Sequence, residues 1–133
     1  MSDTKYKGNF DISPIGQLFD LQSIVAKYGH LELMIWLEER NILPTTKCSD
    51  IASGAGYINI LDWLESRYII PIFKSTITVA KFGYLDVLKW FNNRNIFQSN
   101  DLDKNIKIAN IAAQHGHLNI LNWLVNNFNI LLI

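Results

Sequence analysis

The chain of 133 residues has a single cysteine, Cys48, and only three prolines, and its twelve basic residues balance its twelve acidic ones. One cysteine excludes an intrachain disulfide and a cysteine-based zinc site. Without a net positive charge, neither a nucleic-acid partner nor an anionic membrane partner is expected. No stretch approaches the roughly 18 apolar residues of a membrane-spanning helix, and the polar residues 1–8 have no signal-peptide core. These absences favour an intracellular, cytoplasmic location.

The chain is instead rich in internal repetition, because one unit occurs four times. Each unit has a glycine, and a tryptophan follows each glycine after seven residues. The glycines are Gly29, Gly56, Gly83 and Gly116, and the tryptophans are Trp36, Trp63, Trp90 and Trp123. Successive glycines are 27, 27 and 33 residues apart. Four tryptophans in one register indicate a repeated structure.

Each unit predicts two helices joined by a tight turn. The second, fourth, fifth, seventh and eighth residues after every glycine are apolar. This spacing is typical of a broad apolar stripe on one helix. Another helix is predicted before each glycine, and it is the first helix of the unit. The glycine is suited to the left-handed position that ends this first helix. One pair cannot bury its stripe alone, so we expect an all-α solenoid in which stacked pairs share a core.

The repeat register also predicts the domain organisation. Residues 1–12 are expected to be a flexible N-terminal segment, and residues 13–133 a single repeat domain. The predicted repeats cover residues 13–41, 42–69, 70–97 and 98–128. The six extra residues of the third junction fall in residues 96–103, which are polar and predict a surface loop. Residues 129–133, which are apolar except for Asn129, could fold back as a C-terminal cap or serve as a surface for self-association.

The pattern A-x-x-G-H-L-x-I-L-x-W-L resembles the ankyrin repeat over roughly residues 13–128. The residues that fit the second half of that repeat are Ala113, Gly116, His117, Leu118, Ile120, Leu121 and Leu124. The unit is most similar to the short, Trp-containing ankyrin repeats of giant DNA viruses. The Thr-Pro-Leu-His tetrapeptide of the family is absent, and the 27-residue spacing is shorter than the family's usual spacing. The resemblance implies a helix-turn-helix solenoid of about four repeats with reduced β-hairpin fingers.

The two positions before each glycine are candidates for protein binding, because they vary between units. The candidates are Lys27, Tyr28, Lys81, Phe82, Gln114 and His115. In the family that the chain resembles, such positions lie at the end of the inner helix on the concave binding face. Tyr28 and Phe82 are aromatics that the apolar stripe does not require, and an aromatic beside a lysine is a composition typical of interface hot spots. The alternative is local packing between adjacent repeats.

Three further sets of residues have a structural and a functional interpretation. Lys47, Lys74 and Lys107 lie nine residues before their glycines and form either a basic column for an acidic partner or a solvated face. His30 and His117 share their position with Tyr57 and Tyr84, which favours packing at the turn over catalysis or metal binding. The tryptophans lie within the apolar stripe, which favours core packing over a stacking platform for a ligand.

No catalytic constellation, metal motif or phosphate-binding loop occurs in the sequence, so neither a cofactor nor a metal is expected. The sequence thus predicts a scaffold that binds another protein, a host protein if the source is viral, and not an enzyme. Two alternatives stay open. The chain could be a structural repeat protein that self-assembles through its C-terminal segment, or an accessory domain of a larger enzyme complex.

Overall fold

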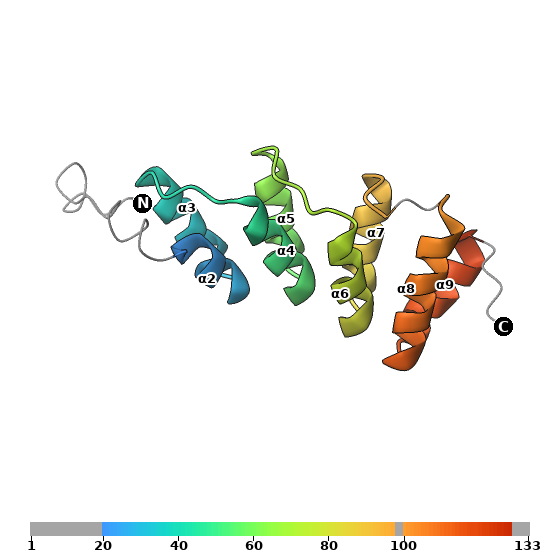
Figure 1. Cartoon of the computed structure of the whole chain (residues 1–133). Helices are drawn as coiled ribbons and strands as arrows, with labels where there is room; N and C mark the ends of the chain where they lie inside the picture. The colour runs from blue at the N-terminus through green and yellow to red at the C-terminus, as the bar shows by residue number, and fades with distance from the viewer. Residues whose placement is uncertain (1–19, 98–99, 129–133) are drawn as a thin grey trace.

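The computed structural model of the chain describes residues 20–97 and 100–128 (Figure 1). In these two ranges the chain forms eight helices and no strand. The helix pairs are α2 (Leu21–Lys27) with α3 (Leu31–Glu39), α4 (Thr46–Ala55) with α5 (Ile58–Glu65), α6 (Lys74–Phe82) with α7 (Leu85–Asn93), and α8 (Leu102–Gln114) with α9 (Leu118–Phe128). The predicted flexible segment 1–12, the first residues of the first repeat and the predicted cap 129–133 lie outside the described residues.

The four pairs stand side by side in one row and form two layers of helices (Figure 1). The first helices of the pairs, α2, α4, α6 and α8, form one layer, and the second helices form the other. Each first helix packs directly against the next first helix, whereas the second helices contact one another less. The prediction of an all-α fold is confirmed. The turns within the pairs line one edge of the row, and the loops between pairs line the opposite edge.

Each predicted glycine ends the first helix of its pair in the left-handed conformation. The φ angles of Gly29, Gly56, Gly83 and Gly116 are 78°, 81°, 81° and 76°. The residue after each glycine donates its backbone N–H to a carbonyl in the last turn of the helix, as Tyr57 does to Ala52 at 3.0 Å. This arrangement satisfies carbonyls that the helix end would otherwise leave free, and it turns the chain back on itself.

The second helices of the first three pairs end in a similar turn that the sequence analysis did not identify. Asn41, Tyr68 and Asn95 adopt positive φ angles of 65°, 61° and 59°. In each case the next residue is an isoleucine whose N–H donates, at 3.0 Å, to a carbonyl near the end of the helix. The signal was present as Arg-Asn-Ile or Arg-Tyr-Ile at residues 40–42, 67–69 and 94–96. Both end-of-helix turns are therefore encoded in each of these units.

The core lies between the two layers and runs the length of the row. The apolar stripe of α5 is fully buried at Ile60, Leu61 and Leu64, and small residues of the first helices such as Ala52 and Ala80 are equally buried. The tryptophans depart from the expectation of uniform core packing. Trp90 is only 6% exposed, whereas Trp36, Trp63 and Trp123 are half-buried and pack against the rim of the core. Each of these three indoles therefore packs only partly against the core, and the rest of its surface is open to other contacts.

Candidate protein-binding face

The ends of the first helices bring the predicted aromatic candidates to the surface. Tyr28 is 61% exposed and Phe82 is 52% exposed. The ammonium groups of Lys27 and Lys81 each lie 5.7 Å from the centre of the neighbouring ring. An ammonium at this distance over a ring face is attracted by the ring quadrupole. We call the edge of the array that carries these two pairs and the glycine turns the turn rim.

The turn rim is not uniform along the row. The unit between the two aromatic–lysine pairs has Gly54 and Ala55 at the same positions, so its side chains there are small. The fourth unit has Gln114 and His115, both exposed, and His115 Nδ1 lies 3.0 Å from the Ile111 carbonyl of its own helix. The first and third units thus carry the apolar part of this face, and the fourth unit carries a polar part.

The predicted basic column lies on the same layer of helices. Lys47, Lys74 and Lys107 are all exposed. The ammonium of Lys47 is 3.8 Å from a carboxylate oxygen of Asp20, the N-cap of α2. Because both side chains of this pair face solvent, the ion pair contributes little to stability.

The two layers of helices carry opposite charge, which the neutral composition conceals. The first helices contain six lysines and two aspartates, and the second helices contain six acidic residues and one lysine. The N-caps Asp20 and Asp101 reduce the positive excess, and three arginines that follow second helices reduce the negative excess. Counted with these neighbours, the first layer has a net charge of +2 and the second layer −2. An acidic partner is therefore favoured on the first-helix layer.

The arginines on the second layer form a regular structure that the sequence analysis missed. The guanidinium carbons of Arg40, Arg67 and Arg94 lie 3.7, 4.1 and 3.7 Å from the ring centres of Trp36, Trp63 and Trp90. Arg67 also binds both carboxylate oxygens of Glu38 in the preceding unit, and Arg94 binds Glu65 in the same way at 2.5 and 3.0 Å. We call this series of stacked and paired residues the Trp–Arg–Glu ladder. The signal in the sequence was an arginine four residues after each of the first three tryptophans.

The ladder changes the protonation of its acidic members. Hydrogen bonds from Arg67 lower the pKa of the Glu38 carboxyl below its ordinary value of 4.5, and burial opposes this only in part. Hydrogen bonds from Arg94 lower the pKa of Glu65 in the same way. The pKa of Arg67 is raised by its bond to Glu38. The planar guanidinium of arginine can form both kinds of contact in the ladder, because it can stack on an indole and bind a carboxylate through two N–H groups at once.

The ladder stops at the fourth unit. Asn92 takes the position of Glu38 and Glu65, and Asn127 takes the position of the arginines. Asn127 still donates to the Trp123 carbonyl at 2.8 Å, as Arg94 does to Trp90 at 3.0 Å. In place of an ion pair, the rings of Phe97, Trp123 and Phe128 form an aromatic cluster with centre distances of 5.1 to 5.8 Å. The third junction therefore has aromatic contacts at the place where the first two junctions have an ion pair.

The residue after each glycine packs against the preceding unit. A Cβ atom at Gly29 would lie 2.8 Å from the ring of Tyr57, and one at Gly56 would lie 3.1 Å from the ring of Tyr84. His117 occupies the equivalent place against Gly83, and its Nε2 lies 2.8 Å from the Lys81 carbonyl. The geometry of His117 agrees with the predicted structural role at the turn. His30, in the first unit, is exposed.

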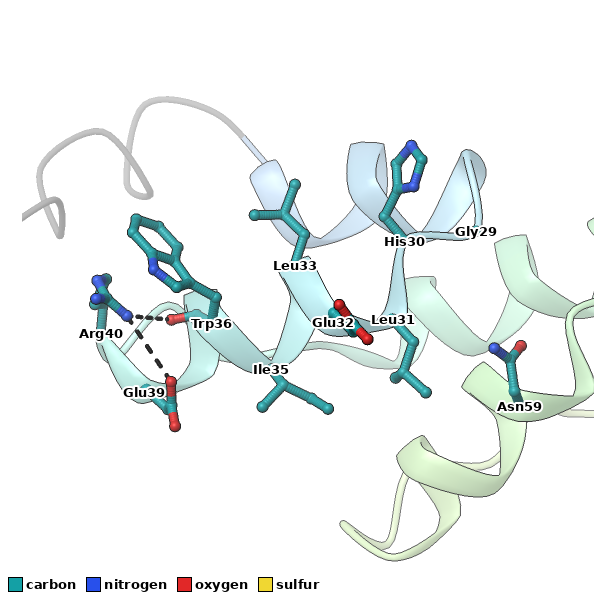
Figure 2. A pocket seen from close by; sticks show the side chains of 10 residues that line it. All are labelled: Gly29, His30, Leu31, Glu32, Leu33, Ile35, Trp36, Glu39, Arg40 and Asn59. Carbon is teal, nitrogen blue, oxygen red and sulfur yellow. Dashed lines mark hydrogen bonds and ion pairs between the residues drawn. The ribbon is translucent and has the colours of Figure 1, made fainter. Parts of the chain in front are cut away.

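A shallow surface hollow lies along α3 (Figure 2). It is lined by Gly29, His30, Leu31, Glu32, Leu33, Ile35, Trp36, Glu39, Arg40 and Asn59. In this hollow, the Arg40 guanidinium lies 3.9 Å from a carboxylate oxygen of Glu39.

Across the described part of the chain, no three His, Cys, Asp or Glu side chains are grouped so that they could hold a metal ion. Among the same residues, no helix has the length and apolar character needed to cross a membrane.

These features define a class of structure, a short array of helix-turn-helix units with a distinct exposed face on each layer. No family model, no curated protein and no solved structure matches the chain.

Proposed function

We propose that the chain is an ankyrin-type repeat protein that acts as a scaffold, and that it binds a protein partner through the turn rim and the first-helix layer. The observation that carries this proposal is the pair of exposed aromatic–lysine contacts, Tyr28 with Lys27 and Phe82 with Lys81. Both rings are more than half exposed, and Tyr68 is the one other aromatic ring among the described residues that is exposed to this extent. Large exposed aromatics that pack little in the free protein are the usual anchors of protein interfaces.

The ankyrin-type part of the proposal is supported by the helix-turn-helix units and by the left-handed glycine that ends each first helix. The first helices lie closer together than the second helices, which agrees with an inner and an outer layer. The junctions contain no strand in residues 20–97 and 100–128, which agrees with the expected reduction of the β-hairpin fingers. Residues 98 and 99 of the long third junction are outside these ranges.

The chemistry of the face favours a partner with acidic and apolar side chains. Lys27 and Lys81 adjoin the two exposed rings, and Lys74 and Lys107 add positive charge on the same layer. Charge of this kind accelerates association and selects among partners more than it adds affinity. We therefore propose an intracellular protein with an acidic surface as the partner, a host protein if the source is viral, with no enzymatic role for this chain.

Affinity capture from a lysate of the native cell tests the proposal. The double variant Tyr28→Ala/Phe82→Ala should lose proteins that the wild-type chain retains, because loss of hot-spot aromatics costs about 2 kcal/mol or more each. Its midpoint of thermal unfolding should stay close to that of the wild type, since both rings are largely exposed.

The matched control is Tyr68→Ala, which removes a ring that is 96% exposed in the loop after α5, on the opposite edge of the array. This variant should retain the same proteins as the wild type. If the double variant and the control retain identical sets of proteins, the turn rim is not the binding face.

A further inference from the structure

The three internal junctions of the array share two contacts, which show what a complete junction requires. A ring from the later unit covers the turn glycine of the earlier unit, as in Tyr57 on Gly29. The fourth residue after the glycine is then fully covered: Ile60, Val87 and Ile120 are 0%, 1% and 0% exposed. The covering ring and the fourth residue after the glycine both lie on the side of their unit that faces the preceding unit, toward the N-terminal end of the row.

The first unit presents this face without a neighbour among the described residues. Leu33 occupies the position of Ile60 but is 43% exposed. His30 occupies the position of Tyr57 and is exposed as well. Both residues line the hollow on α3, and Figure 2 shows their side chains on the same side of the helix. We call His30 and Leu33 the N-terminal end face.

The fourth unit presents the complementary half of a junction. A Cβ atom at Gly116 would meet no atom within 4 Å, in contrast to the other three turn glycines. Leu118 is 67% exposed, whereas Leu31, Ile58 and Leu85 at the same position are half-buried. Ala113 is exposed, although Ala26 and Ala80 at the same position are fully buried. We call Ala113, Gly116 and Leu118 the C-terminal end face.

We infer that two copies of the chain associate head to tail, with the N-terminal end face of one copy seated on the C-terminal end face of the next. His30 then covers Gly116 of the next copy as His117 covers Gly83 within one chain. The same side-chain type thus makes the same contact. Such a junction needs no Trp–Arg–Glu pair, because the third internal junction also forms without one.

A head-to-tail contact has consequences that distinguish it from a symmetric dimer. The two surfaces in contact are different, so each added copy exposes a new free end and assembly does not close at two copies. The end faces share only the turn residues His30 and Gly116 with the turn rim and include neither aromatic–lysine pair, so this inference stands independently of the proposed function.

Sedimentation equilibrium of the full-length chain over a micromolar-to-millimolar series tests the inference. The average mass of the wild type should rise with concentration above the 15.3 kDa of one chain. Leu33→Glu and Leu118→Glu should each remain monomeric, because a carboxylate at an apolar contact should weaken it roughly tenfold or more. His30→Glu is a second N-terminal variant that avoids any cost of altering Leu33. Leu43→Glu is the matched control, since Leu43 is 60% exposed in a loop and belongs to neither end face.

Mixing the variants gives the decisive result. Leu33→Glu keeps an intact C-terminal end face, and Leu118→Glu keeps an intact N-terminal end face. An equimolar mixture should therefore form a dimer that does not grow further, although neither variant associates alone. A wild type that is monomeric throughout the series overturns the inference. A mixture that stays monomeric overturns it too, as does self-association that either single variant retains.

Discussion

Tryptophans in one register need not have one role, and the repeat makes the difference visible. Trp90 is 6% exposed, and its Nε1–H donates to the carboxylate of Asp62 at 2.8 Å. The residue equivalent to Asp62 in the first unit is Ile35, so Trp63 has no such partner. The guanidinium of Arg94 stacks on the ring of Trp90. The third tryptophan is thus fixed by packing, by a hydrogen bond and by a stacked cation.

Truncation of Trp90 should therefore cost more than truncation of Trp36. We expect Trp90→Ala to lower the free energy of unfolding by about 3–5 kcal/mol, the range typical of a buried tryptophan. Trp36→Ala should cost less, because that indole is only partly buried at the rim of the core. Urea unfolding followed by circular dichroism measures both values. Equal losses would show that burial in the array does not govern the contribution of these indoles.

The residue scale is also where sequence and structure can be compared most directly. The left-handed glycines could be predicted, because the preference of glycine for positive φ is local. The contact of His117 with Gly83 could not, since it depends on how far one unit is set from the next. The same holds for the exposed rings of Tyr28 and Phe82: their sequence positions suggested a binding role, but their burial depends on neighbouring helices.

At the scale of helices, the Trp–Arg–Glu ladder compensates for the looser packing of the second layer. Helices α5 and α7 contact each other less than α4 and α6 do. Long arginine side chains bridge this wider spacing, with Arg94 reaching from the end of α7 to Glu65 on α5. The separation of charge between layers could not be predicted from the neutral composition, because it depends on which helices share a layer.

The ladder predicts a specific acid sensitivity. The folded-state pKa values of Glu38 and Glu65 lie below their unfolded value of 4.5. A carboxylate with a lowered pKa contributes stability that is fully present above the unfolded pKa and is lost as the pH falls through the folded pKa. The free energy of unfolding should thus decrease below about pH 4.5 in the wild type, and the Glu38→Gln/Glu65→Gln variant should show a smaller decrease. Urea unfolding at a series of pH values measures the difference.

Removal of the arginines provides the control for this effect. Arg67→Gln/Arg94→Gln leaves both carboxyl groups in place but removes the groups that lower their pKa values. This variant should show the same reduced dependence on pH. An acid sensitivity that neither double variant diminishes would mean that other carboxyl groups cause it.

For the whole molecule, stability arises from contacts between neighbours. The principal helix contacts in the described residues join helices of the same unit or of adjacent units. In such an array the total stability is approximately the sum of the stabilities of the units and of the junctions between them. The 27-residue spacing of the first three glycines further implies that their units are interchangeable in register.

Deletion of residues 57–83 should therefore leave a folded array that is shorter by one unit. The deletion joins Gly56 to Tyr84, so that Tyr84 can cover Gly29 as Tyr57 does, and Arg94 can bind Glu38 as Arg67 does. We expect the shortened chain to unfold cooperatively, with unchanged helix content per residue. Its free energy of unfolding and its urea m-value should both be lower, since less surface is buried.

Deletion of residues 57–86 is the control. It shifts the apolar stripe of α7 by three positions and places Asn93 and Arg94 where Trp63 and Leu64 pack. That chain should not fold cooperatively. If both deletions behave alike, register along the chain is not what holds the units together.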